Sequence, residues 1–231
     1  VPVEAIKQVT GDTDLTPDAG KTSASRQTYV TGRATELAAQ DLRRQIEALE
    51  GVNEGVALEA EASFDPPATP LDENGQGEPY GTYAFAAQMA VVAVDTELGT
   101  TKVVRMVAAH DVGKAINPAL VEGQIQGGIA QGLGLALMEE YLPGRTENLH
   151  DYLIPTVGDM PAMEIILIED PDPNGPQGAK GVGEPGLVPT APAILAAIKS
   201  ATGVSIHQIP ATPDRVRAAI LAQGVTGGVK R

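Results

Sequence analysis

The spacing of apolar residues predicts one long amphipathic helix near the start of the chain. From about Ser23, apolar side chains recur at three- and four-residue steps and charged side chains occupy the opposite side. Gly51 is expected to end this helix, because glycine adopts the left-handed conformation that closes many helices. The segment before it, residues 1–22, is expected to form a short strand followed by a polar loop.

A β-hairpin and several further elements follow from the later pattern. Two valine-rich runs within residues 83–111 flank a turn signal at Glu97-Leu98-Gly99. A helix is expected from Asn117 to about Tyr141, although each interior glycine costs about 1 kcal/mol relative to alanine. The remaining expected elements are a strand at residues 163–168, a helix at 192–201, a strand at 204–209 and a last helix opening at Thr212-Pro213-Asp214.

Strands and helices alternate irregularly, and this order favours an α+β fold with mixed sheets and packed helices. The 231 residues suggest one or two domains. Residues 64–80 are rich in proline and glycine and are expected to form a loop. This loop either joins two sub-lobes, residues 1–63 and 81–231, or is an ordered surface excursion.

Composition excludes several classes of function. A net charge of -14 argues against nucleic acid or an anionic membrane as partner. The absence of cysteine excludes disulfides, thiolate zinc sites, a cysteine nucleophile and an iron–sulfur cluster held by this chain alone. Any redox chemistry therefore passes its electrons to another domain or subunit. With neither a membrane-spanning stretch nor a secretory signal, the expected location is the cytoplasm.

The three histidines predict no metal site on this chain. His110, His150 and His207 lie far apart and match no metal-ligand spacing such as H-E-x-x-H. Each is interpreted as a structural residue. His110 and Asp111 are interpreted as a local hydrogen-bonded pair at the turn into the glycine-rich helix.

Three glycine-rich stretches carry the candidate chemistry, and each has two interpretations. In GAKGVGEPG, residues 178–186, Glu184 is either an acid stabilised at a helix start or a general base held in a pocket. In EGQIQGGIAQGLG, residues 122–134, the small residues indicate either close helix packing or a bare face against a cofactor, with Gln124 as hydrogen-bond partner. In DAGKTSASRQT, residues 18–28, the polar residues form either an ordinary helix cap or a site for a phosphate or a pterin ring.

Together and in this order, three longer stretches resemble the closing part of the molybdopterin-binding region of molybdenum hydroxylases. They are GDTDLTPDAGKTSASRQTYVTG, AAHDVGKAINPALVEGQIQGGIAQGLG and GAKGVGEPGLVPTAPAILAAI. The family includes xanthine dehydrogenases, aldehyde oxidoreductases and nicotinate dehydrogenase, and the S-R-Q version of the first stretch looks more like the bacterial aldehyde oxidoreductase and nicotinate dehydrogenase type. The likeness runs nearly from end to end.

The resemblance implies a role for each matching residue. Glu184 matches the family glutamate that takes a proton from the molybdenum-bound hydroxyl, and Gly183 lies beside it against the cofactor. Gln124 matches a glutamine that hydrogen-bonds the pterin. The segment that binds the pterin and its phosphate or nucleotide tail is matched by Ala24, Ser25, Arg26 and Gln27.

The resemblance also implies the reaction and the partners. An N-heterocycle of the purine or nicotinate type, or an aldehyde, is hydroxylated with water as the oxygen source, and the molybdopterin is expected in its dinucleotide form with molybdenum held through the pterin. Iron–sulfur clusters and FAD are expected on partner subunits, beside a larger molybdenum subunit.

This sequence departs from the family in length, because the other cofactor-contacting half, with its Gly-Phe-Gly motif, is absent. The chain is therefore expected to be inactive alone, as either a separate subunit or a fragment. The rival hypotheses are a non-catalytic assembly subunit and a simple nucleotide-binding module.

Overall fold

A mixed three-stranded sheet in the order β1-β2-β3 lies at the centre of the computed structural model, which describes residues 2–49 and 55–226. The first two strands form the predicted antiparallel hairpin, and the third pairs in parallel with the second. Gly99 stands in the hairpin turn at φ +78°, where a Cβ would lie 2.0 Å from the backbone oxygen of Pro213. The strands are β1 (Ala86–Val94), β2 (Thr101–Asp111) and β3 (Ala162–Ile168).

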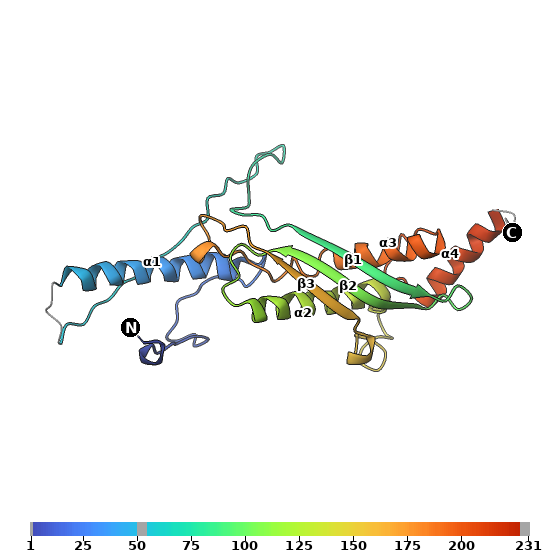
Figure 1. Cartoon of the computed structure of the whole chain (residues 1–231), viewed down its shortest axis with the longest axis horizontal. Helices are drawn as coiled ribbons and strands as arrows, with labels where there is room; N and C mark the ends of the chain where they lie inside the picture. The colour runs from blue at the N-terminus through green and yellow to red at the C-terminus, as the bar shows by residue number, and fades with distance from the viewer. Residues whose placement is uncertain (1, 50–54, 227–231) are drawn as a thin grey trace.

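Four α-helices complete the described part of the chain, and with the sheet they confirm the α+β class. One long helix extends away from one end of the sheet, and the two C-terminal helices lie toward the other end (Figure 1). None of the helices within the described residues is long and apolar enough to cross a membrane. The helices are α1 (Arg26–Ala48), α2 (Pro118–Leu137), α3 (Thr190–Thr202) and α4 (Pro213–Thr226).

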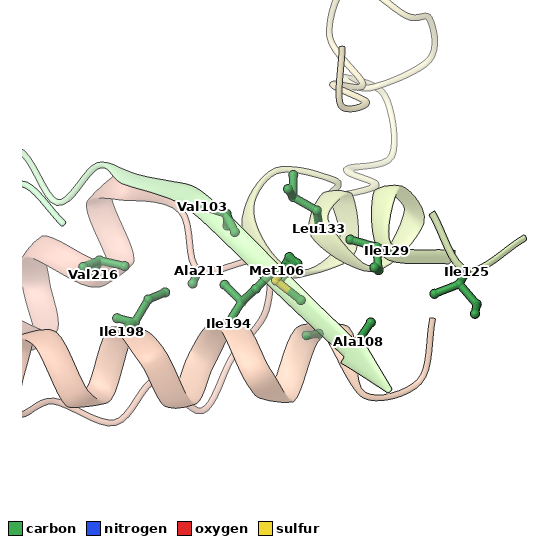
Figure 2. Packing of buried hydrophobic residues seen from close by; sticks show 12 residues of the cluster. Val103, Met106, Ala108, Ile125, Ile129, Leu133, Ile194, Ile198, Ala211 and Val216 are labelled. Atoms are coloured by element: carbon green, nitrogen blue, oxygen red, sulfur yellow. The ribbon is translucent and has the colours of Figure 1, made fainter. Parts of the chain in front are cut away.

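The hydrophobic core fills the space between one face of the sheet and helices α2 and α3. Met106 of β2 is fully buried, as are Ile129 of α2 and Ile194 of α3. Figure 2 shows these side chains with Ile198 and Val216, which extend the same cluster toward α4. Because aromatic residues are scarce, aliphatic side chains make up most of this cluster.

Two predicted strands are wrong, and each error has a physical reason. Residues 2–10 contain only a short 3-10 turn, Val3–Ala5, and none of its residues is buried. At residues 204–209 the apolar alternation correctly marks burial, since Val204 is buried and Ile206 packs against the core. Within the described residues no strand lies beside this segment, so no ladder forms. The predicted helix stop at Gly51 lies outside the described residues.

The loop that precedes β1 is attached to the rest of the fold through Tyr29 of α1. The Tyr29 hydroxyl lies 3.3 Å from the Gly81 carbonyl oxygen and 3.2 Å from the Asp172 carboxylate. Burial, together with the negative charge of Asp172, raises the pKa of Tyr29 to about 12. The phenol therefore keeps its proton, and the Tyr29 hydroxyl is the hydrogen-bond donor in both contacts.

The carboxyl ends of β2 and β3 position the segment that contains GAKGVGEPG. Beyond β2, the Val112 carbonyl accepts from the Lys180 amide at 3.1 Å, and the Lys114 amide donates to the Gly178 carbonyl at 2.8 Å. Gly113 has φ +62°, and a Cβ there would lie 2.3 Å from the Gly178 oxygen. This close approach, which only glycine allows, seats residues 178–184 against the end of the sheet.

Candidate functional site

One cleft of about 460 Å³ brings together the seven residues singled out in the sequence. Its walls come from the start of α1, the first turns of α2 and the segment 179–184. Ligand-binding clefts commonly have volumes of this size. The predicted site residues that line it are Ala24, Ser25, Arg26, Gln27, Gln124, Gly183 and Glu184.

Ser25 and Glu184 are joined by two reciprocal hydrogen bonds. The Ser25 hydroxyl donates to a carboxylate oxygen of Glu184 at 3.1 Å and accepts from the Glu184 backbone amide at 2.8 Å. Ser25 stands in the left-handed region at φ +53° and makes no side-chain cap to α1. Glu184 lies in a turn, six residues before α3 begins at Thr190, so it is not the first-turn acid of that helix.

Two glycines of the same segment lie against Ser25, and they differ in how much room they leave. A Cβ at Gly181 would lie 1.8 Å from the Ser25 carbonyl oxygen, so no side chain fits there without moving the backbone. At Gly183 a Cβ would lie 3.4 Å from the Ser25 hydroxyl oxygen. Gly181 is therefore required for the approach, whereas Gly183 leaves surface open beside Glu184.

Arg26 and Gln27 organise the loop that precedes α1 and also face the cleft. The Arg26 guanidinium donates to the carbonyls of Ala19 and Lys21, at 3.3 and 3.2 Å. The Gln27 amide donates to the carbonyls of Gly20 and Lys21, both at 3.3 Å. The predicted phosphate-binding stretch is thus a closed loop held by two of its own candidate ligands.

Three basic side chains line the cleft, although the chain carries a net charge of -14. They are Arg26, Lys114 and Lys180; Lys114 pairs with Glu169 at 3.0 Å, and Lys180 pairs with the buried Asp111 at 2.6 Å. The first turns of α1 and α2 both border it, and helix N-termini favour anions. Such an arrangement suits a ligand that carries phosphate.

The glycines of α2 serve two different purposes. A Cβ at Gly128 would lie 2.6 Å from the backbone of Gly186, and one at Gly132 would lie 2.5 Å from Thr190. These glycines allow close packing against the start of α3. Gly123 and Gly127 have no atom within 4 Å of an added Cβ, and Gln124 lines the cleft. The packing interpretation is therefore confirmed at Gly128 and Gly132, whereas a cofactor against the open face beside Gln124 stays a prediction.

A second cleft, of about 360 Å³, meets the first at Glu184. The two share Ala24, Ser25, Lys180, Gly181 and Glu184. The remaining lining of the second cleft is largely aromatic and apolar, and an edge-to-face pair of tyrosine rings has centroids 5.8 Å apart. This lining includes Tyr80, Tyr83, Pro185, Val188 and Pro189.

The sequence reasoning missed a buried ion pair beneath this junction. The Lys180 ammonium lies 2.6 Å from the Asp111 carboxylate, and both side chains are 8% exposed. Asp111 also accepts from the Gly113 amide at 3.0 Å. The only sign of this ion pair in the sequence is Lys180 itself, which lies between the glycines of GAKGVGEPG.

The predicted pairing of His110 with Asp111 is wrong, because the two side chains of adjacent strand residues have different partners. The His110 ring contacts the Gln88 amide at 3.2 Å. Gln88 in turn donates to the Gly186 carbonyl at 2.9 Å and accepts from the Thr190 hydroxyl at 2.7 Å. Burial lowers the pKa of His110, so the ring stays neutral at pH 7.

The fold and the site together define a cofactor-binding α+β domain in which one carboxylate lies between a polar cleft and an aromatic cleft. A sequence profile of the family described as molybdopterin cofactor-binding domain matches residues 1–52 and 48–161. The chain belongs to this family of molybdenum hydroxylase domains. The match includes Ala24 to Gln27 and Gln124 and ends before Glu184.

Relatives agree with this assignment over nearly the whole chain. Aldehyde oxidoreductase of Megalodesulfovibrio gigas is 35% identical over 237 residues, covering 95% of this chain and 26% of the relative. A putative xanthine dehydrogenase molybdenum-binding subunit of Escherichia coli is 33% identical over 255 residues, covering 94% of this chain and 33% of the relative. The solved aldehyde oxidoreductase from Desulfovibrio gigas superposes with a TM-score of 0.82 at 34% identity, over 90% of this chain and 24% of that one. The chain thus spans about a quarter to a third of the length of these relatives.

Proposed function

We propose that this chain is the part of a molybdenum hydroxylase that holds the molybdopterin cofactor and supplies Glu184 as catalytic base. The observation that carries the proposal is the position of Glu184 at the junction of a polar cleft and an aromatic cleft. A base that serves both a cofactor and a substrate must face both, and the position of Glu184 on the border of two clefts supports this role. The substrate class is an N-heterocycle or an aldehyde.

The residues of the first cleft fit the cofactor. Gly183 leaves open surface, and Gln124 brings an amide that can both donate and accept. Ala24, Ser25, Arg26 and Gln27 would hold the pterin and its phosphates beside the N-terminus of α1, and the two helix N-termini that border the cleft favour the dinucleotide form, which has two phosphates. The bound cofactor supplies the two-electron redox chemistry of the reaction.

The chain's own residues contribute placement and proton transfer. The Glu184 carboxylate receives the proton, and the Ser25 hydroxyl holds one of its oxygens at 3.1 Å. The second cleft admits the substrate. The rings of Tyr80 and Tyr83 and the adjacent prolines form its surface, and a planar or apolar molecule can displace water from such a surface. Polar and apolar ligand groups thus approach Glu184 from different sides.

The sheet supports the proposal that other parts of a complex pack against this chain. The face turned away from the helices carries exposed apolar side chains, which is typical of a sheet covered on both faces. We propose that the larger part of a molybdenum subunit covers it, in a complex with iron–sulfur and flavin subunits. The exposed apolar residues on the three strands are Met89, Val91, Val104, Ile166 and Ile168.

The test is Glu184→Gln in the assembled complex, with exposed Glu122→Gln on α2 as matched control. Loss of the base should lower kcat by about 100-fold or more, while molybdenum and pterin content stay unchanged. Turnover near wild type would overturn the assignment of the base. A complex that contains neither molybdenum nor pterin would favour a structural subunit or a simple nucleotide-binding module instead.

A further inference from the structure

A buried ion pair lies where the glycine-rich segment leaves the sheet. Lys180 and Asp111 approach to 2.6 Å with 8% of each side chain exposed, and Lys180 makes a second, longer contact of 3.9 Å with the exposed Asp170. The Lys180 amide also donates to the carbonyl of Val112, the residue after Asp111. Side chain and backbone therefore attach Lys180 to the same end of β2.

The other end of the segment has its own attachment. The Gly186 carbonyl accepts from Gln88 of β1 at 2.9 Å and from the Thr190 hydroxyl at 3.1 Å. Glu184 lies between these two attachments, four residues after Lys180. Gly181 and Gly183 lie between Lys180 and Glu184, and glycine leaves the backbone more conformational freedom than any other residue. Fixed ends therefore limit how far the Glu184 carboxylate can move.

We infer that Lys180 and Asp111 are positioning residues that hold the segment 180–184 so that Glu184 faces both clefts. This inference rests on the proposed role of Glu184 as base. A buried ion pair is costly to desolvate, and well-packed apolar residues often stabilise a fold as well or better, so stability alone gives little reason for this pair. Geometry gives a reason for the ion pair, because an error of about 1 Å in the position of a reacting group can cost on the order of 100-fold in rate.

The experiment compares variants of the complete complex that contains this chain. Lys180→Met alone leaves a buried unpaired carboxylate and can prevent folding, so the main variant combines Lys180→Met with Asp111→Asn. We expect kcat to fall by about 10- to 100-fold with KM and molybdenum content unchanged. Amide hydrogen exchange at residues 181–186 should become faster. Lys180→Arg, which keeps the charge and a donor, should recover part of kcat and of the exchange protection.

A second ion pair, whose residues line neither cleft, provides the control. Arg215 and Glu140 approach to 2.5 Å and are partly buried, and Arg215→Met with Glu140→Gln should leave kcat and the exchange at 181–186 unchanged. Wild-type kcat and exchange in the Lys180→Met, Asp111→Asn variant would overturn the inference. So would loss of molybdenum with unchanged exchange, because Lys180 would then bind the cofactor. Full turnover in Glu184→Gln would instead overturn the proposed base, and the exchange measurement would still report on the ion pair.

Discussion

Ser25 and Glu184 are 159 positions apart in the chain, yet they form two hydrogen bonds with each other. The hydroxyl donates to the carboxylate at 3.1 Å and accepts from the Glu184 amide at 2.8 Å. Serine before a helix usually caps that helix. Here the left-handed backbone at Ser25 turns the hydroxyl away from α1 and toward the candidate base.

Ser25→Ala should therefore reduce activity without unfolding the protein. Hydrogen bonds to charged groups contribute about 1.5–3 kcal/mol, so release of the carboxylate should lower kcat by roughly 10-fold or more. Steady-state kinetics of the assembled complex, with molybdenum content measured on the same sample, provide the measurement.

Ser23→Ala is the matched control, because Ser23 lines the same cleft, whereas the hydroxyl that holds Glu184 is that of Ser25. It should retain wild-type kcat. Equal losses in both variants would mean that the hydroxyls act on the cofactor and not on Glu184. Ser25→Thr is unsuitable, since a β-branched residue is strained at positive φ.

How much of this site the sequence could predict depends on the range of the interactions. The helix that begins at Arg26 follows from local periodicity, and the glycine-rich stretches carry a resemblance that predicts Glu184 as the base. The Lys180–Asp111 pair does not follow from either, because it depends on which residues the end of β2 brings together. The second cleft was missed for the same reason: Tyr83 and Val188 are distant in sequence and meet only in the fold.

The predicted strand at residues 204–209, which does not form, also shows that local patterns do not predict long-range pairing. The alternation of Val204 and Ile206 with polar residues reports which side chains are buried. It contains no information about a hydrogen-bonding neighbour, and a strand needs one. Periodicity therefore predicted the burial of this segment and not its pairing.

Two glycines of α2 should respond to alanine in opposite directions. Gly123→Ala should stabilise the helix by about 1 kcal/mol, because its Cβ meets no atom within 4 Å. Gly128→Ala should destabilise the protein, because its Cβ would lie 2.6 Å from the Gly186 backbone. Native-state hydrogen exchange of the α2 amides measures both effects.

The Gly128 variant should also reduce turnover, because Gly186 closes the segment that contains Glu184. Gly123→Ala should not reduce it through that segment. Equal stability of the two variants would contradict the packing role assigned to Gly128.

The tyrosine pair of the second cleft should affect substrate binding more than the cofactor. Tyr83→Ala removes one ring that an aromatic substrate could contact in this cleft, and a pair of aromatic rings contributes about 0.5–1.5 kcal/mol beyond its buried area. We expect KM for an aromatic substrate to rise about 3- to 10-fold, with unchanged molybdenum content. Phe85→Ala is the control, because its ring is 72% exposed and does not line the cleft. A wild-type KM for Tyr83→Ala would place the substrate elsewhere.

His110 should make the end of β2 sensitive to mild acid. Burial lowers its pKa in the folded protein from the ordinary 6.5, so below that pH the open form binds a proton that the folded form does not. Protection of the β2 amides should therefore fall as the pH decreases from about 6.5 toward the lowered folded pKa, by at most about 1.4 kcal/mol per pH unit. Hydrogen exchange between pH 7 and pH 5 measures this change.

His110→Gln should remove this dependence, because glutamine does not titrate. Carboxylates with a lowered pKa, such as Asp172 and Glu169, start from ordinary values of 3.8 and 4.5 and add their own dependence only at lower pH. The range from pH 6.5 to 5 therefore separates the effect of His110 from that of these carboxylates, and the variant separates it from that of other groups. If the wild type and His110→Gln lost protection equally over that range, burial of the neutral ring would not be the cause. Since Gln88 joins His110 to Gly186, a loss confined to the wild type should extend to the amides around Glu184.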